Sequence, residues 1–285
     1  MKTALVIGGA GFVGRHLIPL LVSSEFRVVS CDPAFPCRPK TKHSIDEIPL
    51  AFGNVDWSAF QFDIIVHLGA HIQDISEREK GDIEKYQDIG LDLAVMRYVA
   101  AHPPKECFIY PSSCSIDSAE TDPYAFSKTV GERMAMALHK QGIPVVILRP
   151  FSGYGGDQAE SYPFSAILSR AMAKHNPLTV WGNGRQVRDW IEISDLAKAF
   201  LWAIDHAPRG TPVDIGTGIG TSLFMLAQKI AEGVGYSPTI TADTSKPASS
   251  MRRIADITLA ETFGFEANIL LEEGISRAIF ERTKR

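Results

Sequence analysis

The chain has 285 residues, of which 45% are hydrophobic and 22% are charged, so it can bury the core of one large α/β unit or of two closely joined lobes. The net charge is −4 and no long run has one sign, which argues against nucleic acid or an anionic membrane as the main partner. No apolar stretch reaches about 18 residues, so we expect no membrane span. Four cysteines without a CxxC pair favour a reducing, cytoplasmic compartment; they are Cys31, Cys37, Cys107 and Cys114.

Short, nearly continuous apolar runs alternate with amphipathic stretches through the first half of the chain. The apolar runs predict strands and the amphipathic stretches predict helices. Strands that are apolar on both sides are covered by helices on both faces, so the pattern predicts an α/β fold with a doubly wound, Rossmann-like parallel sheet. The predicted strands are 3–8, 26–32, 63–68, 107–111 and 145–149, and the predicted helices between them are 11–24, 84–102 and 123–141.

The composition changes after Pro150. Residues 151–164 are rich in glycine and aromatic side chains and predict a loop that leaves the sheet. Residues 187–206 predict a return as a strand followed by a helix, with Ser194 as the helix N-cap. Further helices are predicted over 221–235 and 269–282.

The stretch VIGGAGFVG follows the first predicted strand and opens the first predicted helix. Gly8, Gly11 and Gly14 have the spacing GxxGxxG, which allows a sharp turn and lets a pyrophosphate approach the amides at a helix N-terminus. Asp32 follows the next strand, where its carboxylate can accept hydrogen bonds from both hydroxyls of an adenosine ribose. The glycines alone would also fit a tight structural turn, but this context favours a dinucleotide.

The stretch TDPYAFSKTVGERMA, residues 121–135, predicts a helix start with Asp122 as cap and Pro123 in the first turn. Tyr124 and Lys128 are four residues apart, so the phenol and the ammonium share one helix face. A cation beside a phenol lowers its pKa from about 10, which suits proton transfer, although two surface residues can show the same spacing.

The predicted strand 107–111 delivers the serines of PSSCS to the edge of the sheet that carries the glycine turn, because the carboxyl ends of parallel strands meet there. Ser113 can then share a hydrogen bond with a substrate hydroxyl while Tyr124 exchanges its proton, and Lys128 can bond a nicotinamide ribose. Strand-end serines often only cap loop amides. Taken with the tyrosine, the lysine and the glycine turn, these serines favour an acid/base site beside a hydride carrier.

The ordered motifs resemble the extended short-chain dehydrogenase/reductase family, specifically its nucleotide-sugar epimerases and dehydratases. The resemblance extends from Lys2 to about Phe265 and rests on GGAGFVG, DIIVHLGA, PSSCS, YAFSK, LRPFSGYG, WGNGRQVRDWIEISDLAKAF and RRIAD. It implies an NAD cofactor, a nucleoside-diphosphate sugar as substrate and hydride transfer through a keto-sugar intermediate. We expect an epimerase. The alternatives are a dehydratase or reductase of the same substrates, or a non-catalytic dinucleotide-sensing protein.

The resemblance also implies the division of the chain and its site residues. A dinucleotide-binding domain is expected over 1–150, with 187–210 returning to it, and a substrate-binding lobe over 151–285. The implied catalytic residues are Ser113, Tyr124 and Lys128. The implied cofactor-binding residues are Gly8, Gly11, Phe12, Val13, Gly14, Asp32, Asn54, Val55, Leu68, Gly69, Ala70, Tyr124, Lys128 and Pro150. The implied substrate-binding residues are Cys114, Ser115, Ser152, Arg188 on the diphosphate, and Arg252 or Arg253.

Three features depart from the family pattern. Ser152 stands where the family usually has Asn, and Cys114 and Ser115 replace the Asp–Glu pair of the dehydratases. Only ten residues separate Ser113 from Tyr124, where relatives commonly carry about two dozen. The missing loop should leave the sugar end of the pocket more open, or covered by another element.

Two further expectations concern metals and assembly. His67 and His71 fall on a strand end and a loop, which does not suit a metal site, so we predict none. The helices that contain 90–102 and 128–140 have wide apolar stripes, and the family's matching helices pair across a two-fold axis. We therefore expect a homodimer, with Met134 and Leu138 as interface candidates.

The position of Asp32 predicts the choice of cofactor. Its carboxylate should repel a 2′-phosphate, so NAD(H) should bind at least about tenfold more tightly than NADP(H), a difference of about 1.4 kcal/mol. Calorimetric titration with both dinucleotides measures this ratio. Arg38 and Lys40 lie nearby in the sequence, and equal affinities or a preference for NADP(H) would show that they, not Asp32, decide.

Overall fold

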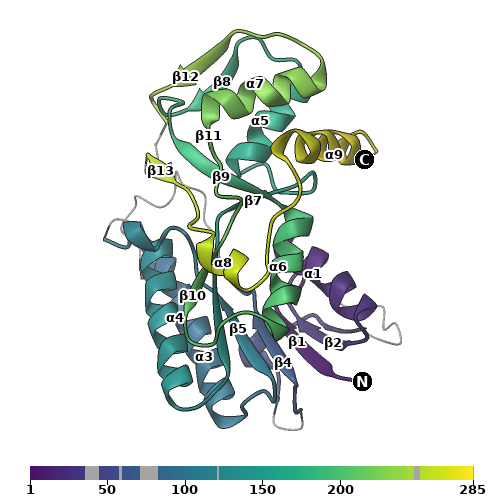
Figure 1. The fold of residues 1–285 in the computed structure, drawn as a ribbon, viewed down its shortest axis with the longest axis vertical. Helices are drawn as coiled ribbons and strands as arrows, with labels where there is room; N and C mark the ends of the chain where they lie inside the picture. Colours follow the sequence, from purple (N-terminus) through teal and green to yellow (C-terminus); the bar gives the residue numbers. More distant parts are fainter. Residues whose placement is uncertain (36–44, 58–59, 71–82, 121, 247–250, 285) are drawn as a thin grey trace.

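The computed structural model describes residues 1–35, 45–57, 60–70, 83–120, 122–246 and 251–284 (Figure 1). Its larger lobe is built on a seven-stranded parallel sheet with the strand order β10-β6-β5-β4-β1-β2-β3. The expected doubly wound α/β fold is therefore confirmed. The strands are β1 (Thr3–Ile7), β2 (Arg27–Cys31), β3 (Ile45–Ile48), β4 (Ile64–His67), β5 (Cys107–Pro111), β6 (Val145–Pro150) and β10 (Pro212–Ile215).

Helices cover both faces of this sheet. Alternate strand residues point to opposite faces, so Val6 packs under α1 (Phe12–Ser23) and α6 (Ile193–Asp205), whereas Leu5 packs under α3 (Gln87–Ala101) and α4 (Pro123–Lys140). Each face has its own apolar cluster, which explains why the strands are apolar throughout rather than alternating.

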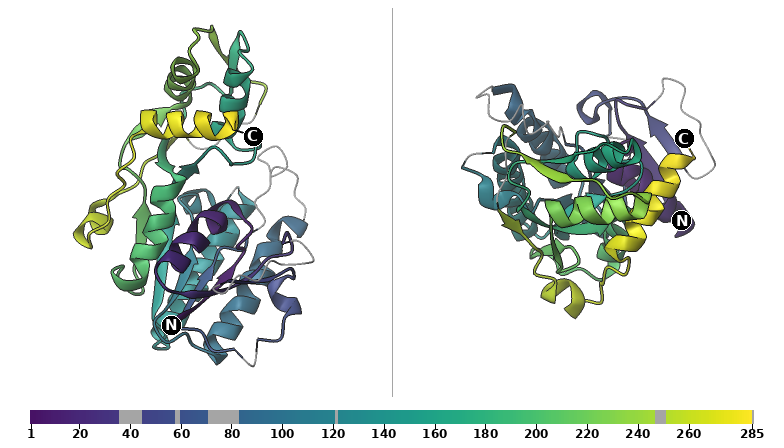
Figure 2. Two further views of the ribbon diagram at one scale, coloured as in Figure 1. Left: turned by 90° about the vertical axis from the view of Figure 1, so that its right-hand side faces the viewer. Right: turned by 90° about the horizontal axis from the view of Figure 1, so that it is seen from above.

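The smaller lobe is made from several segments of the second half of the chain (Figure 2). Strand β9 pairs with three others in a small sheet, and β8 pairs with β12. The predicted loop over 151–164 thus contains a strand and the start of a helix. The elements of this lobe are β7 (Ser152–Tyr154), α5 (Pro163–Met172), β8 (Leu178–Trp181), β9 (Val187–Glu192), β11 (Gly220–Ser222), α7 (Leu223–Val234), β12 (Ile240–Asp243), β13 (Arg252–Arg253) and α9 (Leu271–Thr283). The larger lobe also includes α8 (Thr258–Thr262), which packs beside β10, and the short 3-10 turns η1 (Phe52–Asn54), η2 (Ile83–Tyr86) and η3 (Ile116–Ser118).

The N-cap of α6 differs from the prediction. Strand β9 continues to Glu192, whose carboxylate accepts hydrogen bonds from the backbone N–H of Ser194 at 2.7 Å and from the Ser194 hydroxyl. Ser194 as the cap is therefore wrong, because the helix begins one residue before it. The acid also places a negative charge at the positive end of the helix dipole.

Asp189 joins three separate segments. This side chain is fully buried in β9, and its carboxylate accepts hydrogen bonds from the Thr217 hydroxyl at 2.6 Å and the Gly218 N–H at 2.8 Å. The carboxylate also accepts hydrogen bonds from the N–H of Thr217 at 2.9 Å and from the N–H of Ala255 at 3.2 Å. Because these amides follow β10 and β13, one carboxylate fixes β9 against both lobes.

Within the described ranges, no helix combines the length and the apolar composition that crossing a membrane requires.

Candidate active site

A cavity of about 480 Å³ opens at the carboxyl ends of β1, β2 and β4, where the strand order of the sheet reverses. Gly8 has φ +83°, and a Cβ there would lie 2.6 Å from the backbone nitrogen of Gly69. Only glycine lets the loops after β1 and β4 meet at this distance. A Cβ at Gly14 would similarly press on the backbone of Gly9, so the start of α1 packs directly on the turn.

Asp32 stands at the end of β2 and lines this cavity. One carboxylate oxygen accepts a hydrogen bond from the Ala10 N–H at 3.1 Å, and the other accepts one from the Ala34 N–H at 2.8 Å. Each oxygen can accept a second hydrogen bond, so the carboxylate can hold the glycine turn and two ribose hydroxyls together. The residues present therefore fit a dinucleotide.

The other expected cofactor residues divide into two groups. Gly11, Leu68, Gly69 and Ala70 line the cavity with Gly8 and Asp32. Asn54 and Val55 do not; Ala51 and Phe52 line it instead. Phe12 and Val13 form the first turn of α1 and pack against the core, and the Pro150 carbonyl, at the end of β6, accepts a hydrogen bond from the Cys114 N–H at 3.3 Å.

Sequence reasoning missed the first turns of α3. Gln87, Asp88 and Leu91 line the same cavity, and the side chain of Asp88 is buried. A signal for them exists, because the helix after the strand at a switch point begins beside the cofactor crevice. An acid at the start of a predicted helix, however, looks like an ordinary solvated residue.

Lys128 and Tyr124 share one face of α4, as their spacing predicts. Asp122 caps the helix by accepting a hydrogen bond from the Tyr124 N–H at 3.0 Å. Lys128 is only 3% exposed, and its Nζ lies 5.9 Å from the ring centroid of Tyr124 and donates to the Pro111 carbonyl at 3.1 Å. A buried lysine thus lies beside the phenol.

Ser113 lies in the loop that follows β5, at the same edge. Its hydroxyl oxygen accepts a hydrogen bond from the Ser115 N–H at 3.0 Å, which is the capping role that strand-end serines often have. Ser112 donates to Glu132 at 2.6 Å, and Glu132 forms an ion pair with Arg149 at 2.6 Å. These contacts fix the loop that carries Ser113.

Two arginines meet beside Cys114. Arg188, in β9, is 7% exposed and donates to the Val187 carbonyl at 2.7 Å. Burial, and next the charge of Arg253, lower the pKa of Arg188 to about 10. Burial raises the pKa of the Cys114 thiol against the opposing charges of both arginines. An anion placed here would interact with two guanidinium groups in a desolvated environment.

Arg253 also explains how the short Ser113–Tyr124 connection is covered. From β13 it donates to the hydroxyl oxygens of Ser115 at 3.2 Å and Ser118 at 2.8 Å. A strand that is distant in the sequence therefore contacts the short connection after Ser113. Of the two neighbouring arginines, Arg253 reaches the site, whereas Arg252 is exposed. Ser152 lies in β7, half-buried and paired with Trp190.

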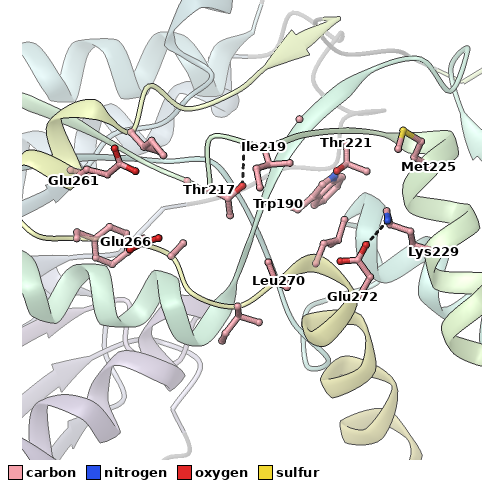
Figure 3. Close-up of a pocket in the computed structure, with 18 residues that line it drawn as sticks. Trp190, Thr217, Ile219, Thr221, Met225, Lys229, Glu261, Glu266, Leu270 and Glu272 are labelled. Atoms are coloured by element: carbon pink, nitrogen blue, oxygen red, sulfur yellow. Dashed lines mark hydrogen bonds and ion pairs between the residues drawn. The ribbon is translucent and has the colours of Figure 1, made fainter.

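A second cavity of about 530 Å³ lies among α7, α8 and α9 (Figure 3). Trp190 and Leu270 line it, together with the Lys229–Glu272 ion pair. None of the predicted site residues reaches it, so it is separate from the candidate active site.

The described residues contain no group of three or more His, Cys, Asp or Glu side chains that could hold a metal ion. His67 instead contacts Asp92 at 2.8 Å, and His71 lies outside the described residues.

Comparison with known proteins agrees with this geometry. A putative UDP-glucose 4-epimerase from Methanocaldococcus jannaschii is 28% identical over 302 aligned positions that cover 96% of both chains. A UDP-N-acetyl-alpha-D-glucosaminuronate decarboxylase from Bacillus cytotoxicus is 26% identical over 98% of this chain and 97% of the relative. UDP-glucuronic acid 4-epimerase from Bacillus cereus, solved with UDP-glucuronic acid and NAD, has the same fold, with a TM-score of 0.86, 24% identity and 99% coverage of both chains.

Residues 4–216 match the model of the NAD dependent epimerase/dehydratase family. This span contains the glycine turn, the Ser113, Tyr124 and Lys128 set, and Arg188. The expected family and its cofactor are thus confirmed: the chain is an enzyme of the NAD dependent epimerase/dehydratase family, and its cofactor is NAD.

Proposed function

We propose that the protein is an epimerase of nucleoside-diphosphate sugars, with UDP-sugars as the favoured class. The observation that carries this proposal is the buried Lys128 beside Tyr124, at the sheet edge that also bears the glycine turn and Ser113. Arg188 and Arg253, which flank Cys114, supply the charge for a diphosphate. The relatives named as UDP-glucose and UDP-glucuronic acid 4-epimerases support the UDP moiety and inversion at C4.

The proposed chemistry follows from the residues at this edge. NAD, when bound, takes up a hydride from a sugar carbon and gives it back. Tyr124 removes the proton of the hydroxyl on that carbon, and the charge of Lys128 stabilises the phenolate that does so. Ser113 donates a hydrogen bond to the same substrate oxygen. The two arginines hold the diphosphate while the keto-sugar turns its other face toward the nicotinamide. Tyr124 then returns the proton to the oxygen on the same sugar carbon.

The same residues would serve related reactions. Some relatives are decarboxylases, but Cys114 and Ser115 in place of the Asp–Glu pair count against a dehydratase. Product mass separates these outcomes, because an epimer has the mass of the substrate, whereas dehydration and decarboxylation remove water and carbon dioxide.

We propose that residues 1–150, with 187–210, form the domain that binds the dinucleotide, and that 151–285 form the lobe that binds the substrate. Strand β10, at Pro212–Ile215, extends the sheet beyond 210, and α6 packs beside α1. We also place the protein in the cytoplasm. The described cysteines Cys31, Cys107 and Cys114 are free thiols, as suits a reducing compartment.

Changing Tyr124 to Phe tests the proposed reaction. The substitution removes the acid/base hydroxyl but keeps the ring beside Lys128, so turnover of UDP-sugars should fall by about 10² or more. Chromatographic separation of epimers measures turnover, and calorimetry with NAD verifies that the variant still binds cofactor. A variant with near-normal turnover would show that the pair has no catalytic role.

Changing Arg188 to Ala tests substrate anchoring. Loss of a buried guanidinium from a diphosphate site should weaken UDP binding at least about tenfold, with NAD affinity little changed. Arg252→Ala is the matched control, because this neighbouring arginine is exposed, and it should change UDP binding less than about twofold. Equal effects of the two substitutions would remove the case for a diphosphate at Arg188.

The proposed assembly is a homodimer formed by α3 and α4. Their outward faces carry a stripe of small and apolar side chains with flanking arginines, comprising Gly90, Leu93, Ala94 and Arg97 on α3 and Phe126, Val130, Arg133 and Ala137 on α4. Of the two earlier candidates, Met134 is half-buried, and Leu138 is only 5% exposed because it packs on the sheet. Leu138 as an interface residue is therefore wrong.

The double substitution Leu93→Glu and Phe126→Glu tests this assembly. Light scattering at micromolar concentration should give twice the chain mass for the parent and one chain mass for the variant, because buried charge opposes the isologous contact. Leu270→Glu, which alters an exposed leucine of the other lobe, should stay dimeric. A monomeric parent would refute the dimer.

A further inference from the structure

A carboxylate is buried behind the catalytic pair. Asp92, on α3, is only 1% exposed. One oxygen accepts a hydrogen bond from the Tyr110 hydroxyl at 2.7 Å, and the other contacts Nε2 of the fully buried His67 at 2.8 Å. Nδ1 of His67 has no hydrogen-bond partner among the described residues, so the polar contact of this ring is the one to Asp92.

The surroundings of this carboxylate favour its ionised form. Burial acts to raise the pKa of Asp92, but the hydrogen bond from His67 and the positive charge of Lys128 outweigh it, so the pKa lies below its ordinary value. An ionised carboxylate in the core is costly unless a cation compensates it. Within the described residues, Lys128 is the lysine whose charge acts on Asp92, and His67 contacts the carboxylate directly.

The Tyr110 ring lies between the acid and the lysine. Nζ of Lys128 is 5.1 Å from the centroid of this ring, whose hydroxyl is bonded to Asp92. The hydrogen bond of Lys128 goes to the Pro111 carbonyl, which carries no charge. Lys128 over the face of the ring and Asp92 at its hydroxyl are therefore both next to Tyr110, and all three side chains are buried, where charges interact over longer distances than at a surface.

Gly131 allows α4 to pack closely against Tyr110 and Asp92. It lies one turn after Lys128 on α4, and a Cβ at this position would overlap both the Tyr110 hydroxyl and the Asp92 carboxylate. The backbone of α4 is therefore pressed against the bond between these two groups, which fixes the depth at which the same helix holds Lys128.

We propose that Asp92 is a positioning residue of the active site, which balances the charge of Lys128 across the Tyr110 ring and so keeps Lys128 protonated beside Tyr124. The role of Asp92 depends on the proposed catalytic role of Lys128. The charged and titratable groups around it are His67 from β4, Tyr110 from β5, Lys128 and Tyr124 from α4, and Asp88 one turn earlier on α3.

Changing Asp92 to Asn tests the charge while keeping the shape. The amide can still accept a hydrogen bond from His67 and donate one to the Tyr110 oxygen. Without the negative charge, Lys128 should lose its proton more readily, so the alkaline limb of the kcat profile should move to lower pH by about one unit. Near neutral pH, kcat should change less than about threefold, and NAD affinity should be unchanged.

Tyr110→Phe is the matched control. It removes a hydrogen bond from Asp92 but leaves the charge, so a merely structural role predicts similar effects of both substitutions. The proposal instead predicts an unshifted alkaline limb for Tyr110→Phe. A profile of Asp92→Asn that coincides with the parent would overturn the proposal and leave Asp92 as a partner of His67 alone.

A measurement without turnover separates this proposal from the proposed function. NMR of the lysine ammonium groups, with Lys128 assigned through Lys128→Met, follows its proton directly. In Asp92→Asn, the ammonium signal should disappear at a pH about one unit lower than in the parent. A shifted signal in a protein inactive on nucleotide sugars would refute only the epimerase. An unshifted signal in an active enzyme would refute only the role of Asp92.

A second route does not depend on the folding of variants at position 92. Lys128→Met leaves Asp92 without its counter-charge, so the loss of unfolding free energy relative to the parent should grow as pH rises through the ionisation of Asp92 in that variant. A loss of stability that is independent of pH would show that the two groups are uncoupled.

Discussion

The close contact between the loops that follow β1 and β4 is the constraint on which the rest of the molecule depends. It requires a residue without a side chain at position 8, and it occurs where the strand order reverses, so the dinucleotide crevice and the sheet topology have one origin. Asp32 secures the turn from β2 through the Ala10 amide. Once this contact is formed, the strands that follow β4 in the chain bring Ser113 and the start of α4 to the same edge of the sheet.

The position of Arg188 depends on a second fixed point, the carboxylate of Asp189. Successive residues of a strand point to opposite faces, so the hydrogen bonds that pin Asp189 also determine where its neighbour Arg188 points. Arg253 reaches the site by another route, through two hydroxyls of the loop after β5. The two guanidinium groups therefore come from neighbouring strands, because Arg253 of β13 is the register partner of Arg188 in β9, and this pairing holds like charges close together.

Sequence alone predicts the parts of this structure that local chemistry determines. Strands β1, β2, β4, β5 and β6 are buried on both faces, so their apolar runs give ends within one residue of those observed. Strand β3 (IDEI) is half polar at the sheet edge, and β10 is a short run before a glycine, so neither gives a strand signal. In the smaller lobe, β9 is predicted from its sequence, whereas a strand such as β13 has only two residues, too few to show a period.

The same limit applies to the site. The helical spacing of Tyr124 and Lys128 is local and predicts their shared face, whereas Asp92 looks like a solvated acid until α4 is packed over it. Choosing between Arg252 and Arg253 needs the register of β13 against β9, which no local pattern contains.

The contact between Arg253 and Ser115 also has a consequence for the order of folding, because these residues are 138 positions apart in the chain. The cavity at the glycine turn is lined only by residues up to Leu91, whereas the anion site needs β9 and β13. During synthesis, the residues that line the cavity at the glycine turn therefore leave the ribosome long before Arg188 and Arg253. The two ends of the candidate site are completed at different stages of translation, and the pair of arginines is the last part to form.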